Sequence, residues 1–124
     1  MCTLPNIALN ATSKDYRLFY GDWSDTDGVS KSSYDVILAS ETIYEPLYYS
    51  RMIDLVTFMA KEGGELWLAA KNYYFGLGGS VIGFESELLA SKSDPDFRWI
   101  KVASRGTMGD GVPRQIIRYR KERK

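Results

Sequence analysis

Short continuous apolar runs and helically spaced apolar positions alternate along the chain, and this alternation predicts an α/β fold. The clearest strand is predicted at 34–39, where four apolar residues follow one another without a polar interruption. Such a run is typical of a strand buried on both faces of a parallel sheet. The run at 66–70 (LWLAA) is predicted to be a second buried strand of the same kind.

The remaining pattern gives the order helix, strand, helix, strand, helix, strand, strand. A helix is expected from Pro46, with Leu47 among its apolar positions, and the glycine pair at 63–64 is expected to end it. The last two strands have no helix between them, so we expect an antiparallel hairpin. We expect the basic tail at 120–124 to be solvated and frayed. The other predicted elements are a helix at 3–11, a strand at 16–20, a helix at 81–90 that includes Ile82, and strands at 97–102 and 115–119.

Composition narrows the classes of function. The 124 residues suit a single domain, 1–124, and their 16 basic and 16 acidic side chains argue against a dedicated nucleic-acid binder. The absence of histidine excludes Ser-His-Asp, Cys-His and histidine-ligated metal sites. The single cysteine excludes an internal disulfide and a four-thiolate zinc site, and it suits a reducing compartment. We therefore expect no metal, and no apolar run is long enough to span a bilayer.

Polar or glycine-rich residues follow three predicted strands, and ligands of open parallel sheets lie beyond the carboxyl ends of the strands. Asp22 and Trp23 pair a carboxylate with a flat ring, which suits an adenine-like ligand. A turn aspartate beside a core tryptophan would give the same pair, and spacing alone favours that interpretation. The aromatic residues at 73–75 either line a cleft or cap the core, and capping the core is the better interpretation. Lys71 either contacts an acidic ligand or is solvated, and a solvated lysine is the commoner case.

Glu41 directly follows the strand at 34–39, in the segment 40–44 (SETIY). A carboxylate there is poorly placed for packing and well placed for a cleft, where it can orient a nucleophile. A carboxylate favoured by the dipole of the following helix is an equally good interpretation. The glycine cluster at 76–79 departs from the phosphate-binding patterns, so a loop that needs positive φ angles is the better interpretation.

Taken in order, these segments resemble the C-terminal part of the class I S-adenosylmethionine-dependent methyltransferases, and within them the histidine protein methyltransferases. The pairing of SETIY with YFGLGG is the most specific part of this resemblance. It extends from residue 3 to about residue 84, and more loosely to the last strand. The segments that carry it are 3–6 (TLPN), 21–24 (GDWS), 34–44 (YDVILASETIY), 48–50 (YYS) and 74–79 (YFGLGG).

The resemblance implies a role for each residue of these segments. Asp22, Trp23 and Ser40 would bind the cofactor, S-adenosylmethionine. Glu41 and Tyr44 would be catalytic, with Glu41 fixing the tautomer of an acceptor imidazole so that its other nitrogen attacks. The substrate would be bound by Thr42, Tyr74, Phe75 and Gly76.

The resemblance also implies a protein-histidine N-methyltransferase that acts in the cytoplasm and nucleus on a large-subunit ribosomal protein. A protein-lysine methyltransferase of the same superfamily, or a non-catalytic remnant that only binds a partner, remain alternatives. By this resemblance, the glycine-rich cofactor loop and the first two strands of the family sheet would lie upstream of residue 1. We therefore expect a partial Rossmann-like sheet, mostly parallel with an antiparallel C-terminal hairpin, and weak or no cofactor binding by this chain alone. We also expect the strand at 34–39 to be an exposed apolar edge.

Overall fold

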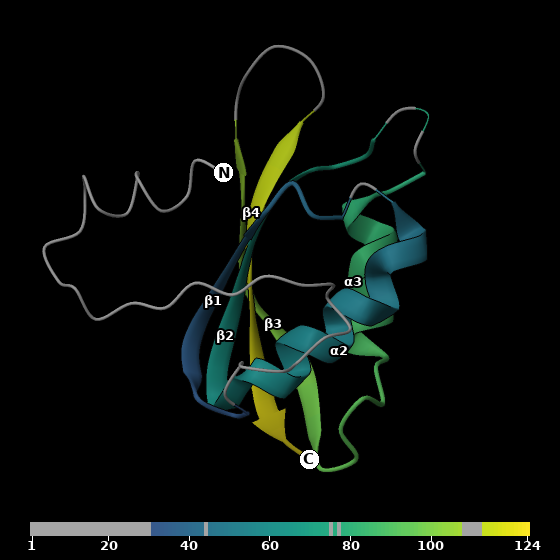
Figure 1. Ribbon diagram of the computed structural model, residues 1–124. Coiled ribbons are helices and arrows are strands. Elements are labelled where there is room, and N and C mark those ends of the chain that lie inside the picture. The colour runs from purple at the N-terminus through teal and green to yellow at the C-terminus, as the bar shows by residue number, and fades with distance from the viewer. Residues whose placement is uncertain (1–30, 44, 75, 77, 108–112) are drawn as a thin grey trace, which may run out of the picture.

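The computed structural model describes residues 31–124 except 44, 75, 77 and 108–112 (Figure 1). The helix predicted at 3–11 and the strand predicted at 16–20 lie outside these residues. The described part is a sheet with helices against it. Its elements are β1 (Tyr34–Ser40), η1 (Pro46–Tyr48), α2 (Tyr49–Met59), β2 (Ala60–Lys71), α3 (Val81–Leu89), β3 (Phe97–Thr107) and β4 (Arg114–Arg123).

The four strands form one mixed sheet in the order β1-β2-β4-β3. β1 and β2 are parallel, with Leu38 opposite Trp67, and β2 and β4 are antiparallel. β3 and β4 form the predicted antiparallel hairpin. The α/β class, the parallel pair and the C-terminal hairpin are thus confirmed, and the carboxyl ends of β1 and β2 lie at one rim of the sheet.

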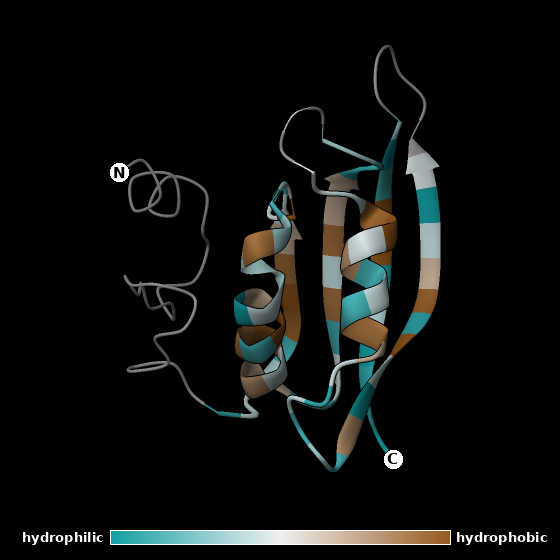
Figure 2. Cartoon of the chain, turned by 90° about the vertical axis from the view of Figure 1, so that its right-hand side faces the viewer, coloured by the Kyte–Doolittle hydropathy of each residue, from teal (hydrophilic) through white to brown (hydrophobic). Residues whose placement is uncertain are grey.

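Both α-helices cover the same face of this sheet (Figures 1 and 2). Apolar positions of α2 and α3 pack there against alternate residues of β2 and β4, as expected for helices with one apolar stripe. The fully buried members of this core are Ile43, Ala60, Leu66, Leu68, Phe84, Leu88, Ile117 and Tyr119. Thr57 of α2 lies at the edge of the core, where its Oγ1 accepts a hydrogen bond from Nε1 of Trp99 at 2.9 Å.

The prediction that the first two apolar strands are buried on both faces is wrong for the described residues. Leu38 is 76% exposed, Val36 is 47% exposed and Trp67 is 38% exposed. The reason is that a continuous apolar run does not say which faces are covered. Here α2 and α3 share one face, and no described residue forms a layer on the other, which we call the open face.

The helix after Pro46 also differs from its prediction. Pro46 begins a 3-10 turn, which leaves Leu47 73% exposed. α2 ends at Met59 because the backbone of Ala60 is already extended. The glycine pair therefore lies inside β2, where a Cβ on Gly64 would approach Tyr34 O to 2.8 Å. In α3, Ile82 points to solvent and is 80% exposed.

The basic tail is not frayed, since β4 continues to Arg123. Lys121 is only 1% exposed, and its ammonium group donates hydrogen bonds to the carbonyl oxygens of Thr57 (2.8 Å) and Ala60 (2.9 Å). These are carbonyls at the end of α2, where helices lack internal donors and favour a cation. The same ammonium lies 4.5 Å from the ring centroid of Phe97.

Candidate functional site

The candidate site is built around Glu41, the first residue after β1. Its backbone φ is +56°, a left-handed conformation that is uncommon for a residue with a side chain. The Glu41 N–H donates to Ala69 O at 2.8 Å, so the backbone is held to β2 in this conformation. Strained backbone of this kind concentrates at functional sites.

Two side chains from other elements hold the Glu41 carboxylate. Tyr74, in the loop after β2, donates its hydroxyl hydrogen to Oε2 of Glu41 at 2.6 Å. Arg114, the first residue of β4, donates from Nη1 to Oε1 at 3.0 Å and forms an ion pair. The carboxylate is therefore fixed from two sides while the Glu41 side chain stays 36% exposed.

Tyr74 is partly buried and lies beside a lysine. Burial, and then the hydrogen bond to Glu41, raise the pKa of Tyr74 to about 12. The backbone N–H of Lys71 donates to the Tyr74 hydroxyl at 3.2 Å, and Lys71 Nζ lies 5.8 Å from the centre of the Tyr74 ring. Thus Glu41 has one cation as a direct partner and a second beyond the tyrosine ring.

Hydrogen bonds fasten the loop after β2 to its neighbours. Asn72 N–H donates to Pro113 O at 2.7 Å, and Gln115 Nε2 donates to Asn72 Oδ1 at 2.7 Å. Positive φ angles at Gly76 (+75°) and Gly78 (+87°) confirm that the glycine cluster is a loop that needs this conformation. These contacts hold the loop that bears Tyr74 at the rim of the sheet.

Tyr49, at the start of α2, joins this loop to the segment after β1. Its hydroxyl donates to Ile43 O at 2.8 Å and accepts from Ser80 N–H at 3.0 Å. Burial raises the pKa of Tyr49. Neither Tyr49 nor the Asn72–Gln115 pair was predicted from the sequence, because both act on backbone that is distant along the chain.

Two hydroxyls flank Glu41. Ser40 ends β1 and is exposed, whereas the Thr42 Oγ1 atom is buried and has no hydrogen-bond partner in the described structure. A buried polar atom without a partner is uncommon, and a bound water or ligand commonly accounts for one. The exposed Ser40 hydroxyl therefore offers a polar contact to a molecule at the rim.

The predicted site residues are distributed as follows. Ser40, Glu41, Thr42, Tyr74 and Gly76 lie at the rim formed by the segments after β1 and β2. Tyr73 is 43% exposed, so it does not cap the core as expected, and Lys71 is partly buried beside Tyr74. Outside the described residues lie Asp22, Trp23, Tyr44 and Phe75.

Arg114, a direct partner of Glu41, was also not predicted as a site residue. It precedes the predicted strand at 115–119, and its contact with Glu41 spans 73 positions. One available signal is a period of two, because Arg114, Arg118 and Arg120 occupy even positions while Ile117 and Tyr119 occupy odd ones, as in a strand. That period places Arg114 on the strand, but it does not identify Glu41 as its partner.

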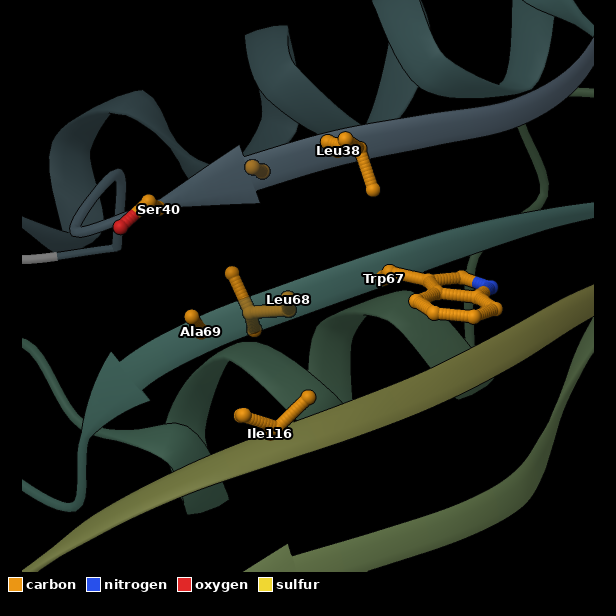
Figure 3. Close-up of a pocket in the computed structure, with 7 residues that line it drawn as sticks. Leu38, Ser40, Trp67, Leu68, Ala69 and Ile116 are labelled. Carbon is orange, nitrogen blue, oxygen red and sulfur yellow. The ribbon is translucent and has the colours of Figure 1, made fainter.

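A shallow depression of about 230 Å³ lies on the open face near the candidate site. Figure 3 shows Leu38 on β1, Trp67 on β2 and Ile116 on β4 along it, with Ser40 at one end. Beside it, Glu65 accepts hydrogen bonds from Arg118 and Arg120, and the Arg118 hydrogen bond is the main cause that lowers the Glu65 pKa to about 2. The depression itself is apolar, so the reactive groups are those at the rim around Glu41.

The described residues contain no group of three or more acidic, cysteine or histidine side chains arranged to hold a metal ion. No described helix has the length and apolar character needed to cross a membrane.

Comparisons with known proteins support the resemblance stated above. The chain is 35% identical over 89 residues to histidine protein methyltransferase 1 homolog of Dictyostelium discoideum, a match that covers 70% of this chain and 28% of that protein. It is 36% identical over 95 residues to the Rattus norvegicus homolog, covering 73% of this chain and 26% of the relative. The chain thus spans about a quarter of the length of these relatives. No protein-family model matches it.

The fold agrees with solved methyltransferases. The N-methyltransferase NodS of Bradyrhizobium japonicum, solved with S-adenosyl-L-homocysteine, superposes with a TM-score of 0.56 at 18% identity. This match covers 77% of the chain and 50% of NodS. The sheet is therefore part of a Rossmann-like methyltransferase fold, and the predicted fold class is confirmed.

Proposed function

We propose that this chain carries the acceptor side of an S-adenosylmethionine-dependent protein-histidine N-methyltransferase. The observation that carries the proposal is the Glu41 carboxylate, held by Tyr74 and Arg114 beyond the carboxyl end of β1. Support comes from the 35–36% identity to histidine protein methyltransferases and from the methyltransferase fold.

Glu41 is proposed to orient the acceptor. A carboxylate held in one position accepts the N–H of a neutral imidazole, which leaves the lone pair of the other ring nitrogen free to attack. The contacts from Tyr74 and Arg114 fix the carboxylate before the substrate arrives, and such positioning is a large part of catalysis in group transfer. Once the ring is methylated it carries a positive charge, and Glu41 is placed to take its N–H proton.

Among the described residues, those that directly follow or end β1 suit contact with the methyl donor. The exposed Ser40 hydroxyl provides a polar contact beside Glu41. When bound, S-adenosylmethionine supplies an electrophilic methyl group on a sulfonium. Ser40 is proposed to contact this cofactor, and Asp22 and Trp23 are proposed to hold its adenine.

The remaining proposals concern the substrate and the setting. Thr42, Tyr74, Phe75 and Gly76 are proposed to bind the acceptor substrate, and Tyr44 is proposed to act on the target side chain. The protein substrate is a ribosomal protein, and the enzyme acts in the cytoplasm and nucleus. The chain spans about a quarter of the length of its relatives, and it is proposed to bind the cofactor weakly or not at all by itself.

A methyl-transfer assay tests this function. The 124-residue chain and, in parallel, the translation product of the complete open reading frame are incubated with ribosomal proteins and methyl-deuterated S-adenosylmethionine. Peptide mass spectrometry then locates the label. Label on a histidine supports the proposal. Label on lysine alone, or no transfer by either polypeptide, refutes it.

A further inference from the structure

The charge around Glu41 is balanced by residues of two adjacent strands. Arg114 on β4 and Lys71 on β2 are direct partners in the sheet register, so both side chains start from the same point of the rim. Arg114 contacts the carboxylate at 3.0 Å, and Lys71 lies over the ring of Tyr74, which is the other partner of that carboxylate. The single negative charge is thus accompanied by two positive charges.

Such a balance discriminates between acceptors. A lone carboxylate attracts the ammonium group of lysine, which is charged at neutral pH, more strongly than it attracts a neutral imidazole. A carboxylate already paired with a guanidinium still accepts a hydrogen bond from an imidazole N–H. It offers little Coulomb attraction to an ammonium, which Arg114 also repels.

We infer that Arg114 is a specificity-determining residue, which selects a neutral imidazole over a lysine ammonium at Glu41. This inference rests on the proposed function, because it assumes that Glu41 receives the acceptor group. Neither the Glu41 carboxylate nor its position after β1 distinguishes histidine from lysine. The charge of Arg114 provides this distinction. Since Arg114 is 55% exposed, the discrimination is moderate and weakens with added salt.

The test compares two small probes, imidazole and n-butylamine, on the isotopically labelled 124-residue chain. At pH 8.5 imidazole is neutral and n-butylamine is a cation, as histidine and lysine side chains would be. Amide shifts of Glu41, Thr42 and Lys71 in nuclear magnetic resonance spectra report binding at the site without any need for methyl transfer. The ratio of the two dissociation constants is the quantity measured.

Three variants separate charge from structure. Arg114→Gln removes the charge and keeps a hydrogen-bond donor, and Arg114→Lys keeps the charge. Arg118→Gln removes an equal charge on the open face, where Arg118 pairs with Glu65 rather than Glu41. We expect the wild-type chain to bind imidazole more tightly, and Arg114→Gln to shift the ratio toward n-butylamine by about three- to tenfold. In Arg114→Lys and Arg118→Gln the ratio should stay within about twofold of the wild-type ratio, because the positive charge beside Glu41 is kept in both.

The outcomes distinguish the inference from the function on which it rests. A wild-type preference for n-butylamine, or an unchanged ratio in Arg114→Gln, overturns the role of Arg114 and leaves Glu41 as an acceptor-binding group. Absence of any shift at Glu41 with either probe refutes the acceptor role of Glu41, and the inference fails with it.

Discussion

Tyr74 donates a 2.6 Å hydrogen bond to Oε2 of Glu41 across 33 positions of the chain. This bond joins the loop after β2 to the residue after β1, at the rim where the two parallel strands end. Glu41 has a left-handed backbone, so the bond also helps to keep a strained residue in place. The site is therefore arranged by contacts that are remote in sequence.

Replacing Tyr74 with phenylalanine tests this bond. The Tyr74 pKa is raised to about 12 from the ordinary value of 10.0, so the native state favours the protonated phenol. The stability that this difference provides is complete below about pH 10 and is lost as the pH rises to about 12. We expect Tyr74→Phe to lower the free energy of unfolding by about 0.5–1.5 kcal/mol at neutral pH.

Carbon-13 labelling of the tyrosine rings shows the titration directly. The resonance that titrates near pH 12 should disappear in Tyr74→Phe and persist in Tyr34→Phe, a matched change at the other end of β1. A resonance that persists in Tyr74→Phe would assign the raised pKa to another tyrosine.

The backbone of Glu41 gives a second prediction. Asparagine tolerates a left-handed conformation better than alanine does, and both substitutions remove the carboxylate. We expect Glu41→Asn to unfold with a free energy about 1 kcal/mol higher than that of Glu41→Ala, measured by urea denaturation. Equal stability of the two variants would show that the φ of +56° carries no strain.

Lys121 gives a third prediction. Methionine has nearly the same length but no donor, so Lys121→Met leaves the Thr57 and Ala60 carbonyls without the ammonium. We expect a loss of about 1–3 kcal/mol in the free energy of unfolding. Lys92→Met, at an exposed position, should change it by less than about 0.5 kcal/mol. A Lys121→Met variant as stable as the parent would mean that burying the ammonium costs as much as its hydrogen bonds provide.

The open face gives a fourth prediction, which concerns association. Among the described residues β1 pairs on one side only, with β2, and Leu38 is 76% exposed on it. Exposed apolar edge strands promote pairing between molecules. We expect the chain to self-associate with rising concentration in sedimentation experiments, and Leu38→Lys to reduce this. Leu47→Lys, at an equally exposed residue outside the sheet, is the control and should not.

The apolar pattern predicted β1 well, because an uninterrupted apolar run of this length, bounded by polar residues, is typical of a strand. It did not predict that Leu38 and Trp67 are exposed, since hydrophobicity gives the preference of a residue and not which face the helices cover. The prediction that the basic tail is solvated and frayed was wrong for a similar reason. Lys121 is buried because the end of α2 provides carbonyl acceptors, and no local sequence signal reports them.

The candidate site was predictable only in part. Glu41 was identified because it follows an apolar strand, and its resemblance to a methyltransferase segment gave it a role. Arg114 was not, because its contact with Glu41 depends on the register that sets Arg114 beside Lys71. That register is a tertiary property of the antiparallel β2–β4 pair.

Glu41 is proposed to orient a histidine for methyl transfer, and the transfer assay on Glu41→Gln tests this role. This substitution keeps the shape of the side chain and removes its charge, while Glu62→Gln removes a surface carboxylate paired with Arg123. Both substitutions are made in whichever of the two polypeptides transfers methyl groups in the assay proposed above. Cofactor binding is measured by calorimetry. We expect Glu41→Gln to abolish histidine methylation and to leave cofactor affinity unchanged, whereas Glu62→Gln should retain full transfer. Undiminished histidine methylation by Glu41→Gln would contradict the role proposed for Glu41.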